Sequence, residues 1–210
     1  MFHIQIPVDT ISQGKQNDAL NINRQRQIEI MKISIIRHEK VDMLWEKNYN
    51  SATFDLACDQ YDKCPIVLSG TINLKTDSAQ RVYISEMSRT YETACKLFKK
   101  DDFVKTPLLN EVPLRSFKDT TNIYPLWLWN FVGRLQWFLQ SDRQAETKRD
   151  TVLRANRMIK MLEDRRENCC LITHGFYMRV LIRELKKHGY TVKNRFGMIA
   201  NLGVIIAEKE

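Results

Sequence analysis

The chain has 210 residues, of which 43% are hydrophobic, and 33 lysines and arginines against 25 aspartates and glutamates leave a net charge of +8. This length and apolar content suit one globular domain and exclude a largely disordered chain. No apolar run approaches the roughly 20 residues of a membrane-spanning helix, and the amino terminus lacks a signal-peptide pattern, so we expect a cytoplasmic protein. The positive charge indicates an anionic ligand, but it does not distinguish a phosphorylated metabolite from a nucleic acid or a membrane surface.

Residues 1–30 differ from the rest of the chain in being polar and rich in glutamine and asparagine. We expect them to be an accessory extension or the product of an upstream start codon. Met31 then opens the apolar run at 31–36, a natural first strand for a compact domain over residues 31–210. Beyond Met31 no internal repeat and no Gly/Pro-rich linker marks a further boundary.

Apolar runs and helical periodicities alternate along residues 31–210. In chain order the patterns predict a strand at 32–37, a helical or irregular stretch at 44–62, a strand at 81–85, a helix at 88–100 and a strand near 104–109. An aromatic insertion at 117–142 follows, then a helix at 145–165, a strand at 169–173, a helix at 176–188 and a last strand at 202–207. Strands that alternate with helices predict a layered α/β sandwich.

Two dipeptides follow predicted strands and are candidates for a binding site. Arg37-His38 ends the run at 33–36, and His174-Gly175 follows the run at 169–173. In α/β sheets the carboxyl ends of the strands form the edge at which ligands bind. A histidine at a strand end is more often a hydrogen-bonded structural residue, so each pair alone is a weak signal. Together the two pairs indicate one phosphate pocket.

Two further polar signals lie at the ends of predicted strands. Ser85, Ser88 and Arg89 follow the run at 82–84, where the predicted helix at 88–100 begins. The free N–H groups and the dipole of a helix amino terminus attract anions. Glu111 follows the apolar pair at 108–109 and places one carboxyl group at the rim of an otherwise cationic site.

In this order, Arg37-His38, the segment at 85–94, Glu111 and His174-Gly175 resemble the histidine phosphatase superfamily, which has the phosphoglycerate-mutase-like fold, and its phosphatase-type branch in particular. The resemblance spans residues 31 to about 208 and is concentrated in these four segments. It implies a three-layer α/β/α sandwich with a mostly parallel central sheet, and a helical cap inserted at about 112–145.

The resemblance also implies a role for each of these residues. His38 would be the nucleophile that becomes phosphorylated, Glu111 would donate and accept protons, and the phosphoryl group would be held by Arg37, Arg89, His174, Ser88 and Gly175. Nearby guanidinium groups support the first role because they disfavour protonation of a histidine nucleophile, and the planar arginine fork grips two phosphate oxygens. This scheme needs no cofactor and no metal, and no cluster of histidine, cysteine and aspartate in the sequence has a convincing ligand spacing.

Two positions after the proposed nucleophile depart from the pattern that is common in the family. Glu39 stands where many members have glycine, so the local backbone must avoid conformations that only glycine tolerates. Leu44 stands near the place of an asparagine that often contacts the substrate phosphate. We therefore expect the transfer chemistry to be kept and the contacts with a sugar phosphate to differ.

The insertion after Glu111 contains three of the four tryptophans of the chain, Trp127, Trp129 and Trp137, and the resemblance implies that it governs substrate choice. A helix that is apolar almost all round is usually part of a core, so we expect this segment to pack against the main domain. The alternative is an exposed lid or patch that binds an aromatic or lipid-like leaving group, a partner protein or a membrane surface.

These observations favour a metal-independent phosphomonoesterase that hydrolyses a small-molecule phosphate ester through a phosphohistidine on His38. The alternatives are a phosphomutase or a protein phosphatase of the same superfamily, and a non-catalytic module that binds phosphate or a partner. Hydrolysis needs only access of water, whereas a mutase must retain a bisphosphate intermediate. No RNP motif, zinc finger or helix-turn-helix pattern indicates a nucleic-acid partner, and the oligomeric state is left open.

Overall fold

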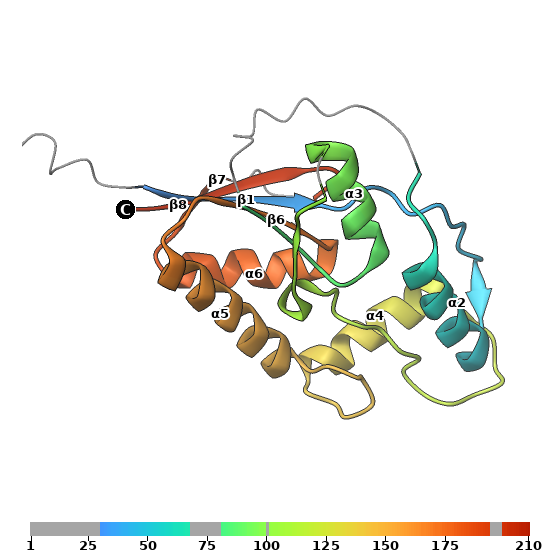
Figure 1. The fold of residues 1–210 in the computed structure, drawn as a ribbon. Helices are drawn as coiled ribbons and strands as arrows, with labels where there is room; N and C mark the ends of the chain where they lie inside the picture. The colour runs from blue at the N-terminus through green and yellow to red at the C-terminus, as the bar shows by residue number, and fades with distance from the viewer. Residues whose placement is uncertain (1–29, 68–80, 100, 194–198) are drawn as a thin grey trace, which may run out of the picture. The chain divides into compact units, whose positions relative to one another are not determined.

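The computed structural model describes residues 30–67, 81–99, 101–193 and 199–210 (Figure 1). The chain divides into two units, which are residues 1–30 with Glu210, and residues Met31–Lys209. The second unit contains all the helices and strands of the described residues. The extension expected at 1–30 lies outside the described residues except for Ile30, and its role stays a prediction.

A six-stranded sheet forms the centre of the unit Met31–Lys209. Its strands lie in the order β4 (Val104–Lys105), β3 (Arg81–Ile84), β6 (Cys169–Thr173), β1 (Met31–Arg37), β8 (Val204–Lys209) and β7 (Thr191–Lys193). The first four are parallel, β8 is antiparallel to β1, and β7 is antiparallel to β8. The mostly parallel sheet that was predicted is confirmed. β1 and β6 lie in its middle because their continuous apolar runs suit burial on both faces.

Helices cover both faces of the sheet. α5 (Lys148–Arg165) and α6 (Gly175–Lys187) pack on the face that presents Ile35, while α3 (Ser88–Phe98) packs on the face that presents Ile36. Successive residues of a strand point to opposite faces, so one apolar run supplies both cores. The three-layer α/β/α arrangement is thereby confirmed (Figure 1).

Some element boundaries differ from the predicted ones where local chemistry interrupts a pattern. The strand expected near 104–109 ends at Lys105, because Pro107, which has no backbone N–H, opens the short 3-10 helix η1 (Pro107–Leu109). The last strand runs from Val204 to Lys209 rather than from 202 to 207. The three-residue strand β7 has no counterpart among the predicted elements, since so short a run shows no periodicity.

The stretch expected to be helical or irregular at 44–62 contains the short strand β2 (Asn48–Tyr49) and the helix α2 (Ser51–Lys63), which begins after the capping residue Asn50. β2 pairs with β5 (Tyr124–Pro125), and β5 leads directly into α4 (Leu126–Phe138). These four elements are called the cap. The cap therefore combines two parts of the chain: residues 48–63, which follow β1, and residues 124–138, which belong to the insertion after Glu111.

The cap has a small core of its own, the aromatic cluster of Tyr49, Phe54, Ala57 and Trp129. The rings of Phe54 and Trp129 stack with their centroids 5.2 Å apart. Trp129 Nε1 donates to the carbonyl oxygen of Tyr49 at 3.0 Å, so its polar atom is satisfied although the side chain is fully buried. This cluster fixes α4 against α2.

The three tryptophans of the insertion have different surroundings. Trp129 and Trp137 are buried, and Trp137 Nε1 donates to Thr151 Oγ1 of α5 at 2.9 Å, which attaches the end of α4 to the main domain. Trp127 is 66% exposed. The expectation that the insertion packs as core is therefore confirmed for one side of α4 and wrong for the other.

Candidate active site

The first two candidate pairs meet at the carboxyl ends of β1 and β6. These strands are parallel neighbours with Arg37 opposite Thr173, so the next residues, His38 and His174, leave the sheet side by side. The backbone N–H of His38 donates to the Thr173 carbonyl oxygen at 2.9 Å, and the two imidazole ring centroids are 4.9 Å apart. The structure thus brings together residues that lie 136 positions apart in the sequence.

His38 is buried, and its hydrogen bond determines which ring nitrogen carries the proton. Its Nδ1 lies 2.6 Å from the carbonyl oxygen of Glu39, which can only accept, so Nδ1 is the protonated nitrogen and Nε2 holds the lone pair. Burial lowers the pKa of His38 to about 3, and the positive charges of Arg89 and Arg37 act in the same direction, against the hydrogen bond to Glu39. The result is a neutral imidazole whose Nε2 is unprotonated.

His174 is fully buried and both of its ring nitrogens have protein partners. Its Nδ1 accepts from Arg89 Nε at 3.1 Å, so Nε2 carries the proton and donates to Ser85 Oγ at 2.9 Å. Burial holds the pKa of His174 well below its usual value, with His38 and Arg89 contributing. His174 therefore orients Arg89 in this geometry, and it can contact a phosphate only by releasing Ser85 or Arg89.

Arg89 lies at the start of α3 and is held from two further sides by the end of α2. Its Nη1 donates to Asp62 Oδ1 at 3.0 Å, and its Cζ lies 5.2 Å from the centroid of the Tyr61 ring. Burial raises the pKa of Asp62, with Arg89 opposing that shift. Asp62 and Tyr61 belong to no recognised motif, so sequence reasoning missed both.

Arg37 has an incomplete set of hydrogen bonds that points to an anionic ligand. Its Nη1 donates to the carbonyl oxygen of Ile199, while its Nε is buried with no partner among the described residues. The guanidinium lies against the first residue of α6, where a Cβ on Gly175 would be 2.9 Å from both Arg37 Cζ and Nε. Gly175 is therefore required for the position of Arg37.

Glu111 is held at the amino terminus of α6. Its Oε1 accepts from the backbone N–H groups of Val112 and Tyr177, each at 2.9 Å, and its Oε2 accepts from that of Phe176 at 3.2 Å. The bonds from Phe176 and Tyr177 satisfy free N–H groups in the first turn of α6, whose N-cap residue is His174.

The two serines of the segment at 85–94 have different positions. Ser85 directly follows β3, is fully buried and contacts His174, whereas Ser88 is exposed at the first position of α3. Ser85 also accepts from the N–H of Met87 and lies 2.8 Å from Thr90 Oγ1, which completes its bonding. A phosphate contact by Ser88 stays a prediction.

Glu39, which replaces the usual glycine, is accommodated as a buried ion pair. Its Oε2 lies 3.0 Å from Lys96 Nζ, and its backbone N–H donates to Thr93 Oγ1 at 3.0 Å, so the segment that follows β1 is tied to α3. Among the described non-glycine residues, those with positive φ are Lys99, Gln140, Arg166 and Leu202. The backbone of Glu39 thus avoids the conformation that would demand glycine.

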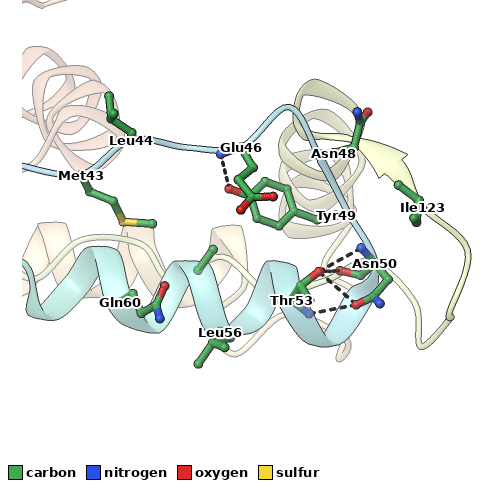
Figure 2. Close-up of a pocket in the computed structure, with 11 residues that line it drawn as sticks. Met43, Leu44, Glu46, Asn48, Tyr49, Asn50, Thr53, Leu56, Gln60 and Ile123 are labelled. Carbon is green, nitrogen blue, oxygen red and sulfur yellow. Dashed lines mark hydrogen bonds between the residues drawn. The ribbon is translucent and has the colours of Figure 1, made fainter.

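Leu44 is 93% exposed. It lines an open cavity of about 400 Å³ between the chain around 43–50 and α2 (Figure 2). The other described residues of the lining are Met43, Glu46, Asn48, Tyr49, Asn50, Thr53, Leu56, Ala57, Gln60 and Ile123, and they include none of the predicted site residues. Leu44 offers no polar contact to a phosphate.

Comparison with known protein families supports the resemblance. Residues 72–210 match the model of the histidine phosphatase superfamily (branch 1), and the chain belongs to that superfamily. The matched span contains Arg89, Glu111 and His174 and begins downstream of Arg37 and His38. No curated protein matches the sequence.

Solved structures share the fold at low sequence identity. A mutant phosphoserine phosphatase of Entamoeba histolytica, in complex with phosphoserine, is 14% identical with a TM-score of 0.54, and the match covers 84% of this chain and 89% of that one. A mycobacterial glucosyl-3-phosphoglycerate phosphatase is 14% identical with a TM-score of 0.53, over 85% of this chain and 90% of that one. These likenesses establish the phosphoglycerate-mutase-like architecture.

Proposed function

We propose that this chain is a phosphatase that hydrolyses a phosphate monoester through a phosphohistidine on His38. The observation that carries the proposal is the contact between His38 Nδ1 and the Glu39 carbonyl oxygen, because it leaves the Nε2 lone pair for attack on phosphorus. The lowered pKa of His38, about 3, keeps the ring neutral near pH 7. Membership of the histidine phosphatase superfamily supports the same reaction class.

In the proposed reaction, the arginines Arg37 and Arg89 bind non-bridging oxygens of the phosphoryl group and compensate its charge. His38 Nε2 forms a bond to phosphorus as the ester P–O bond breaks, and Glu111 gives its proton to the departing alkoxide. The positive charge that develops on the imidazole is stabilised by the Nδ1–H bond to the Glu39 carbonyl.

The second half of the reaction restores the enzyme. Glu111 takes a proton from a water molecule while the water oxygen attacks phosphorus. The N–P bond breaks, inorganic phosphate leaves, and both His38 and protonated Glu111 are regenerated. We propose that no metal or cofactor takes part in either half.

A hydrolase is favoured over a phosphomutase because a mutase must retain a phosphorylated intermediate. Leu44, near the place of a common phosphate-binding asparagine, is exposed and apolar. The substrate is proposed to be a small-molecule phosphate monoester, and a cytoplasmic location stays part of this proposal. The names of the similar structures suggest phosphoserine and glucosyl-3-phosphoglycerate as the first two esters to assay.

The proposal is tested by phosphate release from a panel of phosphoserine, sugar phosphates, nucleotides and an aryl phosphate, in the presence of a metal chelator. We expect turnover by the native chain and a loss of roughly 1,000-fold or more in His38→Ala. His188→Ala is the matched control, because His188 follows the end of α6 and contacts Asn156. A phosphorylated form that survives base and is lost in acid would identify the phosphohistidine.

Two results would contradict the proposal. Undiminished turnover in His38→Ala would eliminate the covalent mechanism. Turnover that disappears with the chelator and returns with added metal ions would eliminate the metal-free scheme.

A further inference from the structure

One face of α4 carries a row of exposed apolar side chains. Trp127, Phe131, Leu135 and Phe138 are 66%, 63%, 43% and 51% exposed, and their spacing of four, four and three residues places them on one face of the helix. These four residues are called the exposed stripe. Leu139, directly after α4, and Ile123, shortly before it, are also exposed.

The exposed stripe is not needed for packing of the cap. The opposite side of α4 already supplies its buried residues, Trp129, Gly133 and Trp137. Trp129 joins the aromatic cluster and Trp137 contacts α5. Arg134 and Gln136 of α4 donate to the carbonyl oxygens of Val112 and Phe117, so residues outside the stripe attach the helix to the protein. A row of large apolar side chains left in water is typical of an interaction surface.

Basic residues lie at both ends of the exposed stripe. Two lysines lie at the amino-terminal end. Lys118 Nζ is 2.9 Å from Oη of Tyr124, which precedes α4, and the exposed Lys47 accepts through its carbonyl oxygen the N–H of Leu126, the first residue of α4. At the other end, Lys148 Nζ lies 4.0 Å from the centroid of the Phe138 ring. The stripe is therefore bordered by cations that stand beside aromatic rings.

Acidic side chains also lie near both ends of the stripe. Asp119, next to Lys118, is balanced by Arg143, from which it accepts at 2.6 and 2.7 Å, while Glu46, Asp142 and Asp150 are further exposed carboxyl side chains. The chain as a whole carries a net charge of +8. The complementary surface is consequently apolar and negatively charged.

We propose that the exposed stripe of α4 docks on the surface of a bilayer that contains anionic phospholipids, with its aromatic side chains in the interfacial layer. Helices that lie in this interfacial layer are typically rich in tryptophan, phenylalanine and leucine on one face, with lysine beside them. A second copy of the chain fits less well, because pairing two stripes would bring their lysines and two net charges of +8 together. None of the described helices combines the length and apolar character needed to cross a bilayer, so the contact is superficial.

The proposal is independent of catalysis and is tested with the full chain by co-sedimentation with vesicles. We expect binding to vesicles of phosphatidylcholine mixed with phosphatidylserine, and weaker binding to phosphatidylcholine alone. The double variant Trp127→Ser with Phe131→Ser should lower the partition coefficient roughly tenfold or more. Lys148→Gln should lower it about fivefold on anionic vesicles, with no effect on neutral ones.

Leu153→Ser is the matched control, because Leu153 is an exposed leucine of α5 outside the stripe, and it should bind like the native chain. Far-ultraviolet circular dichroism and urea denaturation verify that each variant is folded. Three results would overturn the proposal: no binding by the native chain, equal losses in Leu153→Ser and the stripe variant, or a dimer in sedimentation that only the stripe variant dissociates.

Discussion

The strand-end site, which contains His38, Arg89 and His174, and the aromatic cluster of the cap are both buried, but different interactions hold them. At the ends of β1, β3 and β6, polar groups are positioned by short hydrogen bonds, such as those from Arg89 to His174 and from His174 to Ser85. In the cap, the aromatic cluster is held by ring contacts, of which the stacking of Phe54 on Trp129 is an example. The strand-end site depends on the direction of its hydrogen bonds, whereas the aromatic cluster depends on the apolar area that it buries.

This difference has a physical consequence for substitutions. Hydrogen bonds between buried polar groups fix atoms within tenths of an ångström, so a small displacement in the site changes the chemistry before it changes the stability. Apolar contacts contribute in proportion to the area removed from water, so substitutions in the cap act chiefly on stability. The following predictions test that division, beginning with the largest expected effect.

Trp129→Ala is expected to lower the free energy of unfolding by about 3–5 kcal/mol, because it removes the largest side chain of the aromatic cluster and leaves a cavity. Trp127→Ala is the matched control, with an expected change within about 0.5 kcal/mol, since Trp127 stands in water on the same helix. Urea denaturation followed by circular dichroism measures both. Equal losses in the two variants would mean that the cap is not held by its aromatic cluster.

Gly175→Ala should separate chemistry from stability in the strand-end site. The added Cβ would lie 2.9 Å from the Arg37 guanidinium, which must move, so we expect kcat/KM to fall roughly 100-fold. The free energy of unfolding should change by less than about 1 kcal/mol, because alanine favours a helix and the displaced atoms end a flexible side chain.

Gly189→Ala provides the opposite case for comparison with Gly175→Ala. Gly189 has φ +86° after the end of α6, so alanine is strained there and should destabilise the fold by about 1 kcal/mol. The kcat/KM of Gly189→Ala should stay at the native value. If Gly175→Ala kept full activity, the position of Arg37 would not matter for turnover.

Acid should destabilise the fold through the two buried histidines. The pKa of His38 is lowered to about 3 and that of His174 well below 6.5, so the unfolded chain binds protons near pH 6.5 that the folded chain does not. Stability is therefore greatest above pH 6.5 and falls as the pH drops below it. His38 should account for about 2 kcal/mol between about pH 7.5 and 5, a range above most carboxylate titration, and His174 should act in the same direction.

His38→Asn is the variant that separates the two contributions. It should remove about 2 kcal/mol of the pH dependence of the free energy of unfolding over that range, measured by urea denaturation at each pH. An unchanged slope in His38→Asn would show that the pKa of His38 is the same in the folded and the unfolded chain, which would also weaken its role as nucleophile.

The sequence located the strand-end residues well because their signals are local. Arg37-His38 and His174-Gly175 each adjoin an apolar run, and parallel pairing of two such runs brings their ends together in any sheet of this class. The sequence could not tell which of Ser85 and Ser88 lies beside His174, since this depends on where β3 ends and α3 begins. The sequence could not predict that Asp62 accepts from Arg89, because this bond depends on how α2 lies against the main domain.

The chain by itself determined the order of strands and helices, the family resemblance and the residues that gather at the strand ends. These follow from short-range hydrophobic patterns and from residue types whose chemistry is specific. Only the tertiary structure decided which side of α4 is buried, because a helix that is apolar all round has no periodicity to distinguish Trp129 from Trp127. It also decided the proton positions on His38 and His174, since these depend on single hydrogen-bond partners rather than on composition.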